Sequence, residues 1–131
     1  SRIGQMKEPV WILPETVFAL QERLLSEFGG LSGLCEMGLL QSALARPQQQ
    51  YSLGETNLFL LAAAYAHSLI QNHPFHDGNK RIGFTVAVLF IEMNGFHFVA
   101  KEAHSTLNTL ALAAGEMTYP DYAEWLKTNS I

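Results

Sequence analysis

The stretch TNLFLLAAAYAHSLIQNHPFHDGNKRIGFTVAVLFIEM, residues 56–93, decides the fold. Two segments within it, 56–71 and 78–93, have the length of helices and carry apolar residues on nearly every face. Helices that are hydrophobic all round lie at the centre of a bundle, where other helices cover them. We therefore expect two central buried helices joined by a short polar loop.

Further helices are predicted on both sides of this pair. Pro14 opens a helix that Gly29 ends, and a second helix carries apolar residues from Leu39 to Leu44 until Pro47 stops it. After an extended segment at 96–99, two amphipathic helices follow, one ending before residue 115 and one opened by a proline at 120. The sequence thus predicts an all-α, compact, single-domain bundle of about six helices.

Composition limits the classes of protein and partner. The chain has 131 residues, of which 48% are apolar and 15% charged, with a net charge of −4. This suits one domain, expected over residues 6–131, and disfavours a nucleic-acid-binding surface. The longest apolar run, 58–66, is too short to span a membrane. Residues 1–5 precede a methionine and are interpreted as a cloning remnant.

The cysteine content indicates the compartment. Cys35 is the single cysteine, so the chain has neither an internal disulfide nor a CxxC pattern. No positively charged and then apolar N-terminal segment resembles a secretory signal. We expect a protein of the reducing cytoplasm.

A polar, breaker-flanked segment, 48–54, follows Pro47 and is predicted to be an exposed loop. Its residues Gln49, Gln50 and Tyr51 form a candidate flap that aligns a target protein as an added strand. A plain solvated loop is the alternative interpretation.

The nine residues 73–81, HPFHDGNKR, join the two central helices. Pro74 disfavours helical geometry at His73, so the first central helix should end there. Phe75 is expected to anchor the loop in the core. Asp77 is predicted to be the N-cap of the next helix.

The start of that helix has the features of an anion site. The backbone N–H groups of a first helical turn have no helical partner, and the helix dipole favours a negative charge beside them. Gly78 allows close approach of a ligand, and Lys80 and Arg81 add two cations. Because the dipole disfavours cations at this end, their presence indicates an anionic ligand.

This loop resembles the signature of the Fic/Doc superfamily, whose death-on-curing (Doc) branch has the pattern H-x-F-x-[DN]-[AG]-N-K-R. The run GLLQSALARPQ at 38–48, the apolar helix before the motif and LFIEMNG at 89–95 also fit a Doc-like domain. The resemblance implies a Fic/Doc fold across most of residues 6–131.

Two positions favour one activity within the superfamily. AMP-transferring Fic enzymes resemble H-P-F-x-[DE]-G-N-G-R-x-x-R, whereas this chain has Lys80 at the second glycine and Phe84 at the last arginine. Similarity to Doc instead implies a toxin that transfers the γ-phosphate of ATP to a Ser or Thr hydroxyl of a cytoplasmic protein. The family precedent for the target is elongation factor Tu, whose modification inhibits translation. Transfer of AMP is the alternative.

The resemblance also assigns roles at the matched positions. His73 is the general base, and Asp77 holds Mg²⁺ that bridges the phosphates of ATP. The phosphates are bound by Gly78, Asn79, Lys80 and Arg81, and Thr85 is a possible further hydroxyl at the site. No Glu is followed by Gly or Asn, so the inhibitory motif of many Fic proteins is missing. The implied partner is a prevent-host-death-type antitoxin of a type II toxin–antitoxin system, which folds onto a groove of the bundle.

Two other classes of function remain open. A metal-dependent hydrolase would use His67, His73, His76 and Asp77, although their spacing lacks the i, i+4 histidine pair of a helical metal site. A non-catalytic interaction module would retain the fold without the activity. An RNA-cleaving toxin is disfavoured because the chain is acidic.

Overall fold

The computed structural model describes residues 7–33 and 35–131, and this part of the chain contains six helices. They are α1 (Pro14–Phe28), α2 (Met37–Ser52), α3 (Leu58–Asn72), α4 (Asn79–Met93), α5 (Glu102–Ala114) and α6 (Tyr119–Thr128). The prediction of an all-α bundle of about six helices is therefore confirmed. Residues 1–5, interpreted as a remnant, lie outside the described residues. Across the described part, every helix falls short of the length and hydrophobicity that a membrane-spanning segment needs.

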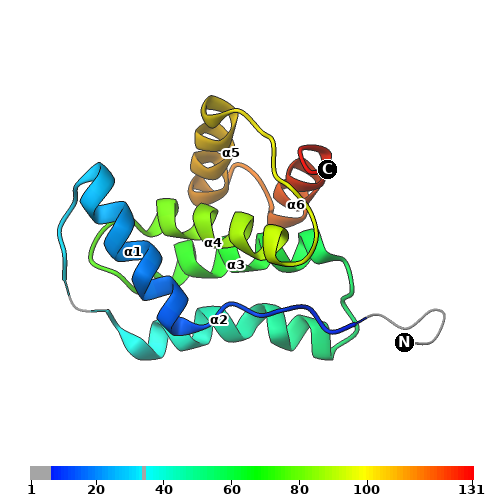
Figure 1. Ribbon diagram of the computed structural model, residues 1–131, viewed down its shortest axis with the longest axis horizontal. Coiled ribbons are helices and arrows are strands. Elements are labelled where there is room, and N and C mark those ends of the chain that lie inside the picture. The colour runs from blue at the N-terminus through cyan, green and yellow to red at the C-terminus, as the bar shows by residue number, and fades with distance from the viewer. Residues whose placement is uncertain (1–6, 34) are drawn as a thin grey trace.

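Helices α3 and α4 lie side by side at the centre of the molecule (Figure 1). Helix α2 runs along α3, α1 crosses the first turns of α4, and α5 and α6 cover the opposite side. Leu61, Leu69, Ile82 and Val86 are fully buried, which confirms the two central helices. Gly83 allows the close approach, because a Cβ there would lie 3.1 Å from the carbonyl oxygen of Ala66 in α3.

Helix α2 continues past Pro47, so the prediction of a helix ending there and a loop at 48–54 is wrong. A proline has no N–H to donate to the carbonyl of the residue four positions earlier, here Ala43. Ser68 of α3 supplies the missing donor: its hydroxyl lies 2.8 Å from the Ala43 carbonyl oxygen. The Ala43 carbonyl therefore has a donor although Pro47 cannot supply one, and the helix extends to Ser52.

The start of α3 also differs from the prediction. The side chain of Asn57 accepts hydrogen bonds from the backbone N–H groups of Phe59 and Leu60, at 2.9 and 3.3 Å. This N-cap sets the first helical residue at Leu58, two residues later than expected.

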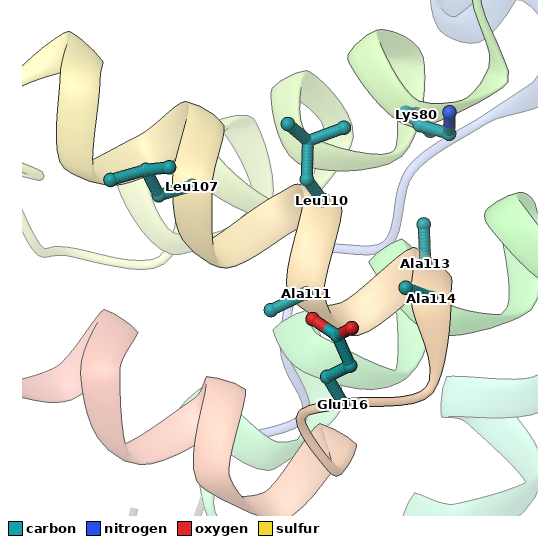
Figure 2. Close-up of a pocket in the computed structure, with 7 residues that line it drawn as sticks. All are labelled: Lys80, Leu107, Leu110, Ala111, Ala113, Ala114 and Glu116. Atoms are coloured by element: carbon teal, nitrogen blue, oxygen red, sulfur yellow. The ribbon is translucent and has the colours of Figure 1, made fainter.

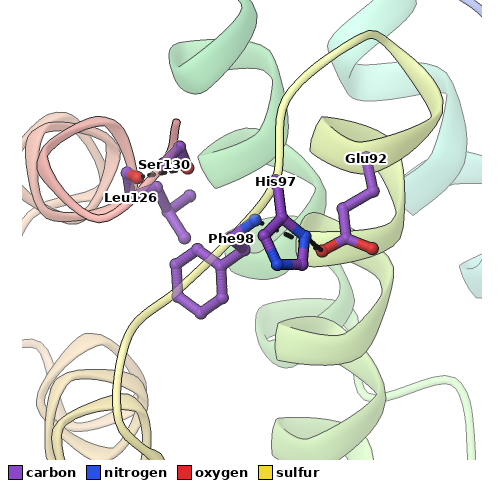
Figure 3. Close-up of polar contacts among 5 residues, drawn as sticks. All are labelled: Glu92, His97, Phe98, Leu126 and Ser130. Atoms are coloured by element: carbon purple, nitrogen blue, oxygen red, sulfur yellow. Dashed lines mark hydrogen bonds and ion pairs between the residues drawn. The ribbon is translucent and has the colours of Figure 1, made fainter.

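The predicted extended segment at 96–99 is confirmed and pairs with the C-terminal residues. His97 and Ile131 exchange two backbone hydrogen bonds, of 2.7 and 2.9 Å. Figure 3 shows how Glu92 of α4 supports this segment: its carboxylate accepts the Phe98 N–H at 3.2 Å and lies 3.4 Å from Nδ1 of His97. In the same view the Ser130 hydroxyl donates to the Leu126 carbonyl at 2.7 Å. The last residues of the chain are thereby fixed to the end of α4, far along that helix from its N-terminus.

Candidate active site

His73 ends α3, as the proline after it predicted. Its backbone is left-handed, with φ 51° and ψ 56°, and its N–H donates to Leu69 at 3.1 Å. It is the single non-glycine residue with positive φ in the described part of the chain. Such a conformation costs about 1–2 kcal/mol, so the surrounding structure must hold it in place. The His73 side chain is exposed at the point where α3 ends and the loop begins.

The inner side of the loop is anchored in the core. Phe75 is buried and packs edge-on against Phe18 of α1, with ring centroids 6.2 Å apart. The Pro74 carbonyl accepts a hydrogen bond from the N–H of Glu36 at 2.9 Å. The predicted anchoring role of Phe75 is confirmed.

Asn79 has a structural function that the sequence did not reveal. Its side-chain amide is buried and binds both backbone groups of Phe75, accepting from N at 3.0 Å and donating to O at 2.9 Å. Both polar ends of this side chain are therefore occupied within the loop. What Asn79 presents to a phosphate in this arrangement is its backbone N–H, in the first turn of α4.

The predicted N-cap at Asp77 is wrong, because Gly78 occupies that position with φ 77° and ψ 18°. The Asp77 carboxylate accepts two backbone hydrogen bonds. One oxygen accepts the Gly78 N–H at 2.9 Å, and the other accepts the N–H of Leu31 from the loop after α1, at 3.2 Å. Gly30 makes room there, since a Cβ on it would lie 3.1 Å from Oδ2 of Asp77.

These contacts determine the charge of Asp77. Hydrogen bonds from the Leu31 and Gly78 N–H groups hold the pKa of this carboxyl below its usual value, with nearby His76 and Arg81 acting in the same direction. The side chain is exposed. Asp77 is thus a solvent-facing anion at neutral pH, with the chemistry of a Mg²⁺ ligand.

The first turn of α4 has the properties of an anion site. Its first intrahelical hydrogen bond runs from the Ile82 N–H to the Gly78 carbonyl at 2.9 Å, so the N–H groups of Asn79, Lys80 and Arg81 precede the helical ladder. Both cationic side chains are exposed, and no ion pair with a carboxylate involves them among the described residues. The Arg81 guanidinium lies over the Phe28 ring, 4.5 Å from its centroid.

A groove between α1, α4 and α5, with a volume of about 400 Å³, opens beside these cations. Its lining includes the apolar Leu24, Phe28, Phe84 and Leu110, with Lys80, Arg81, Thr85, Glu102, Ser105, Thr106 and Thr109. The Thr85 hydroxyl donates to the Arg81 carbonyl at 2.8 Å, so it stabilises α4 while lining this α1–α4–α5 groove. The contribution of α5 was missed from the sequence, which offers no motif there.

A second hollow lies on the other side of α5. Figure 2 shows it between Lys80 and the last turns of α5, where Leu107, Leu110, Ala111, Ala113 and Ala114 line it together with Glu116. Lys80 contributes to both this hollow and the α1–α4–α5 groove.

The candidate flap does not join the site. Gln49, Gln50 and Tyr51 lie in the last turn of α2, whereas the first turn of α2 is beside the loop, since Asn72 donates to the Leu39 carbonyl at 3.0 Å. Ten residues of helix separate the two ends by roughly 15 Å. Instead, the Gln50 amide lies 3.5 Å from the Tyr119 hydroxyl and Tyr51 packs edge-on against Trp11.

The other histidines do not assemble a metal centre. His67 stacks on Tyr119, with ring centroids 5.7 Å apart, and burial followed by the charge of Arg46 lowers its pKa. Among the described residues, no three His, Cys, Asp or Glu side chains are grouped so that they would bind a metal ion.

Comparisons with known proteins show the family of the chain. The model of the Fic/DOC family matches residues 11–91, which include the whole loop, all of α3, and α4 up to residue 91. The chain belongs to the Fic/Doc family. It is 32% identical over 117 residues to "Protein kinase doc" of Escherichia phage P1, covering 88% of this chain and 92% of that protein. It is 40% identical over 75 residues to "Toxin Doc" of Mycolicibacterium smegmatis, covering 56% of this chain and 58% of that protein.

These relatives place the chain in the death-on-curing branch of the family and support a Doc-like toxin. The family match and the name of the phage P1 relative also support a transferase.

Proposed function

We propose that this protein is a Doc-type toxin that transfers the γ-phosphate of ATP to a Ser or Thr hydroxyl of a cytoplasmic protein. The observation that carries the proposal is the first turn of α4. It combines unpaired N–H groups with the exposed Lys80 and Arg81, and the exposed carboxylate of Asp77 precedes it. A helix start with two cations and an adjacent anion is suited to a triphosphate that is bound together with Mg²⁺.

The chemistry follows from the positions of these groups. The acceptor oxygen attacks the γ-phosphorus, the bond from that phosphorus to the β,γ-bridging oxygen breaks, and ADP leaves. His73 takes the proton of the acceptor hydroxyl as general base. The N–H groups of the first turn, with Lys80 and Arg81, stabilise the charge on the transferring group. Mg²⁺, when held by Asp77, would neutralise charge on the phosphates.

Phe84 supports phosphate transfer over AMP transfer. It stands where AMP-transferring Fic enzymes have their last arginine, and it packs edge-on against Phe98 with ring centroids 5.8 Å apart. An aromatic wall offers no hydrogen bond to a diphosphate at this position. Lys80, which stands in place of a glycine, adds a cation to the same α1–α4–α5 groove that Phe84 lines.

The target proposed on family precedent is elongation factor Tu, and the consequence of its phosphorylation is inhibition of translation. We further propose that a prevent-host-death-type antitoxin restrains the toxin. A segment of that partner would fold as a helix in the α1–α4–α5 groove, with apolar residues on Leu24 and Phe84 and a carboxylate facing Lys80 and Arg81.

The test uses ATP labelled at either the α- or the γ-phosphate, with Mg²⁺ and cell lysate or purified elongation factor Tu. We expect protein labelling from the γ-phosphate alone, and its loss in His73→Ala. His76→Ala is the matched control, since His76 is exposed in the same loop and has no assigned role; it should label as the wild type does. Transfer of the α-label would identify AMP as the cargo. An absence of label from either position, with antitoxin binding retained, would identify an interaction module.

A further inference from the structure

Gln21 is a polar residue buried beneath the active-site loop. It lies in α1 and is 5% exposed, although its position in a surface helix would suit an apolar side chain. Its Oε1 atom is buried and has no hydrogen-bond partner among the residues that the structure describes. A buried oxygen without a partner destabilises a fold, so its retention calls for a reason other than stability.

The other end of the Gln21 amide binds the loop. Its Nε2 donates to the backbone carbonyl of Asp77 at 2.8 Å. The next N–H, that of Gly78, donates to the Asp77 carboxylate at 2.9 Å. The peptide group between Asp77 and Gly78 is therefore held at its oxygen by α1 and at its nitrogen by the carboxylate.

This peptide group sets the geometry of two functional elements. On its N-terminal side is the exposed carboxylate of Asp77. On its C-terminal side is the left-handed Gly78, after which the first-turn N–H groups of α4 begin. A Cβ on Gly78 would lie 3.5 Å from Gln21 Nε2 and 3.7 Å from Oε1, so the amide packs directly against the turn. Rotation of this peptide would redirect both elements together.

We propose that Gln21 is a positioning residue, which orients the Asp77–Gly78 peptide so that the carboxylate and the first-turn N–H groups face one ligand. The inference rests on the proposed phosphate transfer. Gln21 binds the backbone of the loop through the Asp77 carbonyl and would affect the ligand only by orienting that backbone. An equally large apolar side chain would fill the same space, avoid the unpaired oxygen and leave the peptide unheld.

The test compares Gln21→Met, which preserves size and removes the donor, with Gln21→Glu, which preserves shape and replaces the donor by an acceptor at neutral pH. We expect Gln21→Met to unfold at the same temperature as the wild type or higher, while kcat for γ-phosphate transfer falls by about 10-fold or more, a typical effect of losing an outer-shell partner. Gln21→Glu should also lose kcat, because its carboxylate repels the Asp77 carbonyl.

Ser68→Ala is the matched control, since Ser68 is equally buried and donates a hydrogen bond of the same length, 2.8 Å, away from the loop. It should lower the unfolding temperature and leave kcat unchanged. A purely structural Gln21 would reverse this pattern, with stability lost and kcat retained in Gln21→Met. Wild-type kcat in both Gln21 variants would overturn the proposal.

Amide hydrogen exchange separates this inference from the proposed reaction. In Gln21→Met, the Gly78 amide and the first turn of α4 should exchange faster, with α3 and α6 unchanged. If the wild type transfers no γ-label but this local change occurs, the reaction was wrong and the positioning role stands. Unchanged exchange at Gly78 would refute the positioning role whatever the reaction.

Discussion

The pairing of Pro47 with Ser68 makes a quantitative prediction about the stability of the bundle. Pro47 leaves the Ala43 carbonyl without its helical donor, and the Ser68 hydroxyl replaces that donor from the neighbouring helix. Ala43 is fully buried, so water cannot take over the role. Ser68→Ala should therefore leave a buried carbonyl unpaired.

The expected cost is about 1–3 kcal/mol, the desolvation penalty of a buried polar group that loses its partner. With an unfolding entropy of roughly 2.1 cal/mol/K per residue, a chain of 131 residues changes its Tm by about 4 °C per kcal/mol. Ser68→Ala should thus lower Tm by about 4–11 °C.

A double-mutant cycle tests the mechanism of this loss. Pro47→Ala restores an N–H that reaches the Ala43 carbonyl, so Ser68→Ala should cost about 1 kcal/mol less in that background. Urea denaturation of the four proteins measures the coupling. Ser105→Ala is the control: Ser105 is equally buried and donates to the Lys101 carbonyl at 3.1 Å, but that carbonyl also accepts the Ser105 N–H at 3.0 Å. An equal cost of Ser68→Ala in both backgrounds would refute the reasoning.

Three further predictions concern the loop and the histidine beneath α6. Asp77→Asn should reduce γ-phosphate transfer on the order of 100-fold at fixed Mg²⁺ while Tm stays within a few degrees, because the lost charge is exposed; unchanged transfer would contradict the metal role. Gly78→Ala should lower the free energy of unfolding by about 1–2 kcal/mol, since φ is +77° there, whereas Gly38→Ala in open space within α2 should be neutral or stabilising. Burial lowers the pKa of His67, so the stability it contributes is complete above its unfolded pKa of about 6.5 and is lost as pH falls below that value. His67→Gln should therefore flatten the dependence of unfolding free energy on pH between about 7.5 and 5.5, and an unchanged dependence would contradict this prediction.

The sequence predicted those features that depend on neighbouring residues. Pro14 and Gly29 fixed the ends of α1, and the proline after His73 located the end of α3. Prediction from the sequence failed where a contact with a distant residue overrides the usual preference of a local residue type. Pro47 is compatible with a helix because Ser68, 21 positions later, supplies a donor.

The active-site loop shows the same division. Its residue types predict an anion site, and the structure leaves both cations at the start of α4 exposed. The prediction that Asp77 is the N-cap of α4 was wrong. Gly78 takes the N-cap position in a left-handed conformation, and the Asp77 carboxylate instead accepts the N–H of Leu31 from the segment after α1. Gln21 carried no motif, and its function depends on a contact across 56 residues of chain. Local patterns identify the chemistry of a site, whereas the residues that orient it are distributed through the fold.

The two ends of the loop explain how such an exposed site stays ordered. His73 and Gly78, five positions apart, both have a left-handed backbone conformation, one at the end of α3 and one at the start of α4. Between them, Phe75 is bound on both backbone groups by the Asn79 side chain and is buried in the core. Phe75 and the Asn79 side chain anchor the loop on its inner side, whereas the side chains of His73, Asp77, Lys80 and Arg81 are exposed. Since groups held in place before a ligand arrives need no reorganisation during reaction, this division favours a preformed phosphate site. Control of such a site would then act on access to it, which is the role that the adjoining α1–α4–α5 groove suits.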